Sequence, residues 1–311
     1  MWILWTALGL LLTFIIVCFV IGFVLWYKAV PTPAPEKYIN RYAERKDETE
    51  FYQYHLRALN TLEEMPSEDV EIKSYDGLTL HAYYKHASSK TSKTIISVHG
   101  YLGNGFFTAP EFSHWLIDFN YNILFIDLRS YGKSEGKYTT YGIEDYKDLL
   151  KWIDYIIERN GEDSEIALFG ISMGGNTVAN VSDKVPTQVK CIIDDCGFTS
   201  CYEQFRFMMK EQFHIPQFFL FFANIINIMV CHFSFKDIDA RACLKKSRVP
   251  VLFIHGKEDS FVPTYMGLEN YEACGSQKDI KIYEGAEHAR SLFTHQEEYK
   301  RSVLDFLAKY L

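Results

Sequence analysis

Residues 165–180 read EIALFGISMGGNTVAN, and this stretch decides the fold. Its first part is a short apolar run typical of a buried strand, and its last part continues as a helix. Between them lies a G-x-S-x-G pattern with Ser172 at its centre. Gly170 and Gly174 lack the Cβ atoms that would clash where strand, turn and helix cross, so the serine can adopt a strained backbone conformation. The stretch therefore predicts a serine hydroxyl exposed at the start of a helix.

Strand and helix patterns alternate along the rest of the chain. Two runs around Asp76-Gly77 indicate a hairpin, and most other runs are apolar on both faces, as buried parallel strands are. The strand-like runs are 69–74, 78–84, 94–98, 122–126, 165–169, 190–193, 251–254 and 279–283. Helical periodicities lie between them, and residues 47–62 indicate a helix before the first strand. The pattern predicts an α/β fold with a mainly parallel eight-stranded sheet flanked by helices.

One interval interrupts this alternation. Between Cys196 and Pro250 no strand pattern occurs, and the interval includes the apolar, aromatic stretch from Phe213 to Phe235. An insertion of this length in a compact domain usually has a task, such as that of a lid or cap. We expect a helical cap at about residues 199–248. The alternative is a plain helical hairpin that packs its apolar face on the sheet.

The amino-terminal segment is apolar, with no charged residue between Trp2 and Trp26. A helix of this length spans about 37 Å, enough to cross a bilayer core with some tilt. Aromatic side chains, which favour the membrane interface, lie near both of its ends. A cleaved signal peptide needs a charged amino-terminal region and a shorter apolar stretch, and the chain has neither. Residues 1–28 are therefore predicted to be a transmembrane anchor that contacts the membrane through residues 2–26.

The flank behind this segment is basic, whereas only the α-amino group precedes it. The basic side chains are Lys28, Lys37, Arg41, Arg45 and Lys46. The positive-inside rule predicts that this flank and the domain behind it, residues 47–311, lie in the cytoplasm. Prolines at positions 31, 33 and 35 predict a stiff linker over residues 29–46 that holds the domain off the membrane surface.

Composition excludes some classes of function. The 311 residues carry a formal net charge of −8, so no strong positive field exists to hold phosphates, and nucleic acid is not an expected partner. The 7 cysteines form no CxxC pair and no Cys/His spacing of a zinc site. We expect reduced, structural thiols and no bound metal. Aromatic residues make up 16% of the chain, which indicates a large apolar interior, an apolar binding surface, or both. The oligomeric state stays open.

Further chemistry is expected at the carboxyl ends of the strands, where α/β sheets place functional side chains. A serine nucleophile needs a base, and the base needs an orienting acid, in the chain order serine, acid, histidine for this strand–turn–helix arrangement. Asp259 and His288 follow Ser172 in that order, each just after a predicted strand. We expect these three residues to be catalytic. Asp194, at the end of the strand before the cap, is the alternative acid.

Five motifs at strand ends together carry a family resemblance. They are HGYLGN at 99–104, DLRSYGKSEG at 127–136, GISMGG at 170–175, HGKEDSFVP at 255–263 and GAEHARS at 285–291. From about Glu71 to Leu311 the chain resembles the α/β-hydrolase superfamily, in its serine-aminopeptidase-like and lysophospholipase-like branch. Ser130 departs from this pattern, because relatives often have glycine there. Serine is small, so we expect only a local adjustment.

The resemblance implies a two-step acyl transfer, in which Ser172 forms an acyl-enzyme that water then hydrolyses. It assigns the oxyanion-hole donors to the backbone N–H groups of Tyr101 and Met173, and it requires no metal or organic cofactor. Asp127 and Arg129 are expected to tie strand-end loops together rather than to take part in catalysis.

The cap and the anchor bear on the substrate. The aromatic cap favours an apolar acyl or alkyl group, and the anchor places the site near lipid, so a carboxylic ester with an apolar acyl group, or a lipid-like ester, is the first choice. Phe219 and Phe222 are expected to line the acyl pocket; the alternative is that the cap docks on the membrane surface. A peptidase or a thioesterase would use the same triad, so these activities stay open. A non-catalytic, membrane-tethered binding module is a second alternative, although such a protein would be expected to have lost part of the triad.

Overall fold

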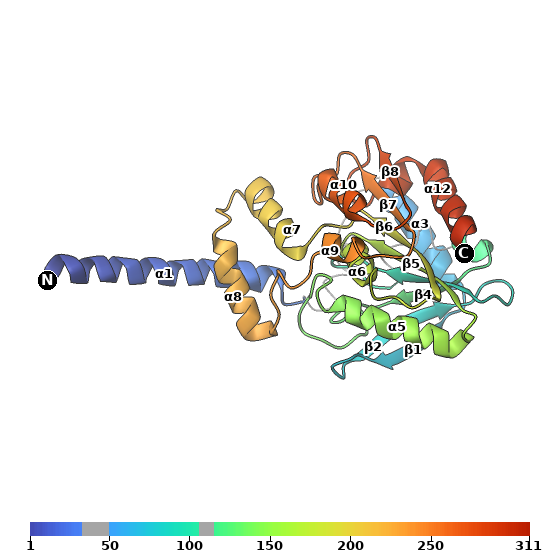
Figure 1. The fold of residues 1–311 in the computed structure, drawn as a ribbon, viewed down its shortest axis with the longest axis horizontal. Coiled ribbons are helices and arrows are strands. Elements are labelled where there is room, and N and C mark those ends of the chain that lie inside the picture. The colour runs from blue at the N-terminus through green and yellow to red at the C-terminus, as the bar shows by residue number, and fades with distance from the viewer. Residues whose placement is uncertain (33–49, 106–114) are drawn as a thin grey trace.

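A single eight-stranded sheet forms the centre of the chain, in the order β1-β2-β4-β3-β5-β6-β7-β8. The computed structural model describes residues 1–32, 50–105 and 115–311 (Figure 1). The strands are β1 (Glu68–Lys73), β2 (Thr79–Lys85), β3 (Lys93–Val98), β4 (Asn122–Ile126), β5 (Glu165–Ile171), β6 (Val189–Asp195), β7 (Val251–Gly256) and β8 (Lys278–Tyr283). Strand β2 pairs antiparallel with β1 and β4, and all other pairs are parallel. The predicted α/β architecture with a mainly parallel sheet is confirmed.

Helices cover both faces of this sheet, because the central strands are apolar on both sides. Neighbouring residues such as Ile95 and Ile96 of β3 are both fully buried but belong to separate cores. One core lies under α3 (Glu50–Glu64) and α12 (Gln296–Tyr310). The other lies under α5 (Asp145–Asn160), α6 (Met173–Val181) and α10 (Thr264–Ala273). Helix α3 is the helix expected before the first strand; residues 47–49 lie outside the described part of the chain.

The insertion between β6 and β7 is a helical cap. It consists of α7 (Cys201–Phe207), a π-helical turn η1 (Met208–Gln212), α8 (Phe219–Cys231) and α9 (Ala240–Leu244). Helices α7 and α8 stand away from the sheet, beside the amino-terminal helix (Figure 1). The predicted helical cap insertion is therefore present, and its regular elements are all helices, joined by turns and loops.

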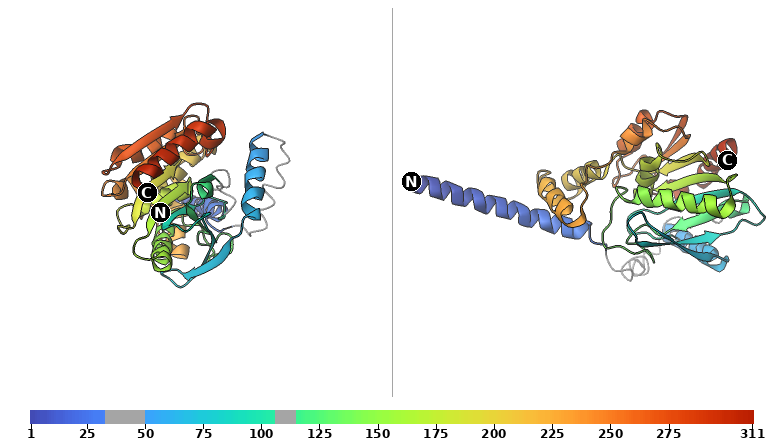
Figure 2. Two further views of the ribbon diagram at one scale, coloured as in Figure 1. Left: turned by 90° about the vertical axis from the view of Figure 1, so that its right-hand side faces the viewer. Right: turned by 60° about the horizontal axis from the view of Figure 1, so that its bottom comes forward.

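The amino-terminal apolar segment forms one helix, α1 (Trp2–Ala29), long and apolar enough to cross a membrane. Residues 2–17 are exposed and project from the domain, and only the carboxyl-terminal end of the helix meets the rest of the chain (Figure 2). From Cys18 onward, every fourth residue is buried: Cys18, Gly22, Trp26 and Val30. This spacing puts one face of the helix against the cap.

Helix α1 crosses α8 at close range. A Cβ on Gly22 would lie 2.7 Å from the Cβ of Phe222, so the two backbones can approach only because this residue is glycine. The rings of Phe19 and Phe222 meet edge to face, with centroids 5.1 Å apart. Trp26 Nε1 donates a hydrogen bond of 3.0 Å to the buried Asn227 Oδ1. These contacts fix the inner half of α1 on the cap.

The chain continues from α1 directly onto the domain, which corrects the expectation of a spacer beginning at residue 29. The N–H of Thr139 donates to the carbonyl of Val30 at 2.9 Å, and the N–H of Thr32 donates to that of Lys137 at 3.1 Å. The Thr32 hydroxyl also donates to Ser130 Oγ at 2.7 Å. The rest of the predicted linker, residues 33–46, lies outside the described residues.

Candidate active site

Ser172 lies on a sharp turn between β5 and α6, with a backbone φ of 57°. Two glycines make the turn possible. A Cβ on Gly170 would lie 2.2 Å from the carbonyl oxygen of Gly174, and one on Gly174 would lie 2.0 Å from that of Val98. No side chain fits at such distances, so both glycines are required by the crossing of strand and helix. The turn holds Ser172 at the amino-terminal end of α6, as the sequence pattern predicts. The residue is not exposed as expected but is buried in the wall of a cavity.

The three side chains expected to be catalytic meet at the carboxyl edge of the sheet. His288 Nε2 lies 2.9 Å from Ser172 Oγ, and His288 Nδ1 lies 2.7 Å from Asp259 Oδ2. The other oxygen of Asp259 accepts the N–H groups of Phe261 and Val262 at 2.9 and 2.8 Å. Asp259 follows β7 and His288 follows β8, so the fold brings together residues far apart in sequence.

A second histidine contacts the acid. His255 Nε2 lies 3.3 Å from Asp259 Oδ2 and donates to the carbonyl of Val262 at 2.9 Å. Burial raises the pKa of Asp259, but hydrogen bonds from His255 and His288 outweigh it and bring that pKa down to about 2. The carboxylate therefore stays ionised across the physiological range. His255 is not among the residues that the sequence predicts to be catalytic; its spacing of four residues from Asp259 is the signal that could have identified it.

Asp194, the alternative acid, is not part of this arrangement. Its carboxylate is buried at the end of β6 and accepts the N–H of Gly197 at 3.0 Å. Burial raises its pKa to about 7. The neighbouring Asp195 accepts the hydroxyl hydrogen of Tyr299 at 2.7 Å, and burial raises its pKa to about 6. Neither carboxylate shares a hydrogen bond with His288 in the described part of the chain.

A cavity of about 820 Å³ opens in front of Ser172 and His288. Its volume is toward the upper end of the range of about 300–1,000 Å³ that is usual for small-molecule sites. The wall is mostly apolar, and parts of it come from the cap, from α1, from α3 and from the segment after His288. The cap contributes Phe205, Met208, Met209, Phe213, Ile215, Leu220, Ala223 and Phe235.

The two phenylalanines expected to line this cavity are placed elsewhere. Phe222 packs its ring against Phe19 of α1, and Phe219 packs against the neighbouring core. Leu220 and Ala223, on the adjacent face of α8, stand on the wall instead. The helix is apolar on every side, so its sequence pattern does not specify which face turns toward the cavity.

The two backbone groups expected to stabilise an oxyanion lie beside the serine. Tyr101 and Met173 both line the cavity with Ser172. Met173 is the first residue of α6, where backbone N–H groups lack partners within the helix. Gly100 packs so closely on the turn that a Cβ there would lie 3.3 Å from the Cβ of Ser172. The positions of both residues suit the expected role.

One group of potential metal ligands occurs at the site, within the described residues. The ligand atoms of Cys196, Asp259 and His288 lie within 4.8 Å of one another. The imidazole and the carboxylate are hydrogen-bonded to each other, and burial raises the pKa of the Cys196 thiol well above its ordinary value. A metal would need the thiolate and a free imidazole nitrogen. The donor set therefore fits a hydrogen-bonded triad better than a metal centre.

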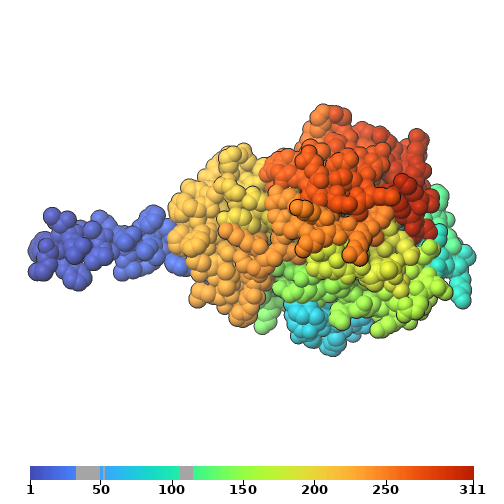
Figure 3. Space-filling view, viewed as in Figure 1, coloured from blue at the N-terminus to red at the C-terminus, as the bar shows by residue number. Residues whose placement is uncertain are grey.

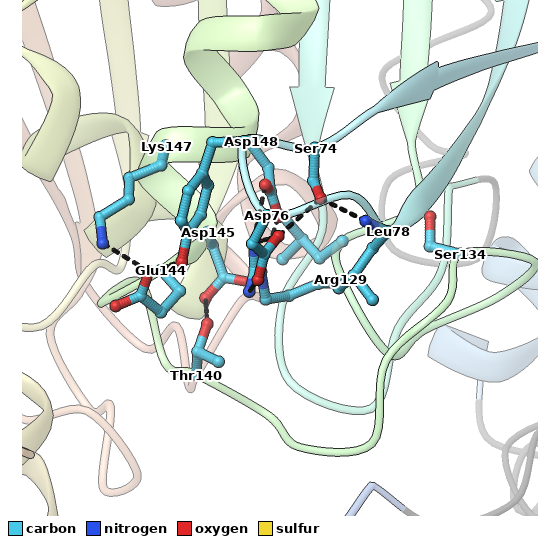
Figure 4. A network of polar contacts seen from close by, with 12 residues as sticks. Ser74, Asp76, Leu78, Arg129, Ser134, Thr140, Glu144, Asp145, Lys147 and Asp148 are labelled. Atoms are coloured by element: carbon cyan, nitrogen blue, oxygen red, sulfur yellow. Dashed lines mark hydrogen bonds and ion pairs between the residues drawn. The ribbon is translucent and has the colours of Figure 1, made fainter. Parts of the chain in front are cut away.

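Arg129 and Asp127 tie loops together, as expected. Arg129 donates to both oxygens of Asp148 on α5, at 2.7 and 2.8 Å, and to Asp76 in the β1–β2 turn at 3.2 Å (Figure 4). Asp127 accepts the backbone N–H of Gly105 at 2.8 Å and that of Lys133 at 3.0 Å. Ser130, in the same motif, adopts a φ of 67°, a left-handed conformation that glycine adopts more readily than serine.

Comparisons with known proteins agree with this architecture. The prolyl oligopeptidase family matches residues 113–311. YqkD of Bacillus subtilis (strain 168) is 28% identical over 253 residues, which are 79% of this chain and 81% of YqkD. The lysophosphatidylserine lipase ABHD12 of Rattus norvegicus is 24% identical over 242 residues, 73% of this chain and 58% of the lipase. The solved esterase Pf2001 of Pyrococcus furiosus is 24% identical with a TM-score of 0.66, and the match covers 82% of this chain and 93% of the esterase. The structural likeness confirms the α/β-hydrolase fold.

Proposed function

The chain belongs to the prolyl oligopeptidase family, and from this premise we propose that it is a membrane-anchored serine hydrolase that cleaves a carboxylic ester with an apolar acyl group. The observation that carries the proposal is the hydrogen-bonded series Ser172–His288–Asp259 at the wall of a large apolar cavity. A binding module without catalytic function would not need a strained serine, a base and an ionised acid connected by hydrogen bonds.

In the proposed reaction the Ser172 hydroxyl attacks the ester carbonyl while His288 Nε2 takes its proton. Asp259 orients the ring through Nδ1 and offsets the charge of the imidazolium. The backbone N–H groups of Tyr101 and Met173 would stabilise the oxyanion, and each donor of this kind is worth about 3 kcal/mol in comparable enzymes. His288 then passes its proton to the leaving alcohol. In the second step it activates the water that hydrolyses the acyl-enzyme.

The cavity supports an apolar substrate. Its cap wall consists largely of phenylalanine, methionine and leucine side chains. Such a wall favours an acyl chain, because each buried methylene stabilises the complex by about 0.8 kcal/mol. Two similar proteins are an esterase and a lysophosphatidylserine lipase, which is consistent with an ester. The family name also raises a peptide amide as the second candidate, and a thioester would suit the same triad.

A panel of substrates on the full-length protein in detergent tests this proposal. With p-nitrophenyl esters from acetate to palmitate, kcat/KM is expected to rise with chain length, by up to about fourfold per methylene, until the cavity is filled. A peptide p-nitroanilide and an acyl thioester are measured beside them. A clear preference for the peptide, or rates independent of chain length, would contradict the proposal of an apolar ester.

We further propose that α1 anchors the protein in a membrane with the catalytic domain in the cytoplasm. The basic residues after α1 support this orientation through the positive-inside rule. All seven cysteines are free, and six of them are buried, as suits a reducing compartment.

This orientation predicts the result of a protease-protection experiment. Protease added to intact cells is expected to leave the domain uncut, and after permeabilisation it is expected to digest the domain. The measurement is an immunoblot of the domain in both samples, with a known surface protein as the control for protease access. Cleavage in intact cells would place the domain on the outer side.

A further inference from the structure

The outer side of the cap carries an exposed apolar patch, formed by Phe213 and by residues in and directly before α8. Besides Phe213, its members are Phe218, directly before α8, and Phe221, Ile228, Met229 and Val230 of α8. Phe221 is 59% exposed and Met229 is 71% exposed. Large side chains of this kind, gathered on one short segment, mark a surface that meets an apolar partner. The cap lies where α1 leaves the domain (Figure 3).

The length of α1 indicates what this patch meets. Only residues 2–17 project free of the domain, and sixteen residues at about 1.5 Å each extend about 24 Å. The hydrocarbon core of a bilayer is about 30 Å thick. The missing length has to come from residues 18–21, which already lie beside α8. A membrane spanned by α1 therefore reaches the level of α8, and the apolar patch lies in its surface.

The same part of α1 also forms a wall of the active-site cavity. Val24, Leu25, Trp26 and Ala29 line it, together with Leu220 and Ala223 of the adjoining helix α8. The cavity thus extends from Ser172 to the point where the chain enters the membrane. Lys28, the first charged side chain after the apolar run, lines the same end of the cavity and marks the level of the interface.

We propose that the apolar patch of the cap and the inner half of α1 form a membrane-docking surface, through which a single-chain lipid ester passes directly from the bilayer into the cavity. Its acyl chain lies against Leu25 and Ala29, and its carbonyl reaches Ser172. The inference rests on the proposed function for both the ester chemistry and the anchor. It adds that the anchor helix is part of the substrate site, so a domain cut free of α1 lacks one wall of its cavity.

The docking is tested without any reference to catalysis. Full-length protein carrying Phe221→Trp is reconstituted in phosphatidylcholine vesicles with brominated acyl chains, which quench tryptophan at contact distance. Wild type has 5 tryptophans, so its fluorescence is subtracted as background. The fluorescence that the tryptophan at position 221 adds is expected to be quenched. Leu268→Trp, at an exposed apolar position on α10, is the matched control and should stay bright. Equal quenching at both positions, or bright emission at position 221, would overturn the docking.

The role of α1 in the cavity is tested by the same substitution at two positions of one helix. In Gly22→Leu the new side chain collides with Phe222 and with the backbone of Ala223, which stands on the cavity wall. In Gly9→Leu it meets no atom within 4 Å. We expect Gly22→Leu to raise KM for p-nitrophenyl palmitate by at least about tenfold, equivalent to losing about two methylenes of contact, with the acetate ester unchanged. Gly9→Leu should match wild type on both esters.

The outcomes separate this inference from the proposed function. An unchanged KM for the palmitate ester in Gly22→Leu, or an equal rise in KM for the acetate and palmitate esters, would contradict the role of α1 as a wall of the cavity. Ester hydrolysis itself would still stand. Absence of turnover of either ester by wild type would contradict the proposed function, and quenching at position 221 would still report whether the cap docks on the bilayer.

Discussion

Replacing Ser172 with alanine is expected to lower kcat/KM for the preferred ester by at least about a thousandfold. The substitution removes the Oγ atom that lies 2.9 Å from His288 Nε2, so no acyl-enzyme can form. It keeps the Cβ, and alanine has the same backbone constraints as serine at a φ of 57°, so the fold should persist. The measurement is steady-state kinetics together with labelling by a fluorophosphonate probe, which should react with wild type and not with the variant.

Ser291→Ala is the matched control for this prediction. Ser291 is buried on α11 (Ser291–Thr294), three residues from His288, and its hydroxyl has no hydrogen-bond partner among the described residues. Its loss should leave both turnover and labelling close to wild type. Labelling that survives Ser172→Ala would show that another residue is the nucleophile.

Replacing Asp259 with asparagine is expected to lower kcat by about a thousandfold to ten-thousandfold. The reason lies in the oxygen that accepts the N–H groups of Phe261 and Val262. An amide must place its own oxygen there, so its NH₂ group points at His288 Nδ1. That nitrogen then has to accept, and the ring proton moves to Nε2, where it faces Ser172 instead of accepting its proton. Kinetics on the acetate ester, with circular dichroism to verify the fold, measures the effect.

Asp194→Asn is the matched control, since it makes the same change at the alternative acid. It should retain turnover, because Asp194 has no contact with His288 in the described chain. If Asp194→Asn were folded but inactive while Asp259→Asn remained active, the two roles would have to be exchanged.

The variant Asp194→Asn should also change how the free energy of unfolding depends on pH. Burial raises the pKa of Asp194 in the folded state to about 7. The protonated carboxyl therefore contributes its full stabilisation below the pKa of the unfolded state, and this contribution is lost as the pH rises toward 7. Asparagine does not titrate. The free energy of unfolding of Asp194→Asn relative to wild type is therefore expected to increase from pH 5 to pH 8, by a few kcal/mol at most. Denaturant unfolding at the two pH values measures it, and a constant difference would contradict the buried, protonated carboxyl.

The strands, the turn at Ser172 and the meeting of Ser172, Asp259 and His288 were all predictable from local signals. Gly170 and Gly174 are required because a Cβ at either position would collide with the backbone of the turn or of the neighbouring strand β3. A five-residue sequence pattern is enough to reveal this requirement. Apolar runs such as Ile166–Phe169 specify buried strands because both of their faces must leave water. Asp259 and His288 were identified from their positions after strands, which the fold then brings to one edge of the sheet.

Three features were decided by tertiary structure alone. The contact of His255 with Asp259 depends on how the turn after β7 folds back, and the docking of residues 30–32 depends on partners more than a hundred residues away. The third is the orientation of α8, whose apolar residues surround the helix and therefore specify no inner face. The face of α8 that carries Phe222 packs against α1 at Gly22. Leu220 and Ala223 of α8 then face the cavity. The sequence by itself determined that this helix is apolar; its partner determined which of its residues face a substrate, because burial is a property of what packs against a side chain.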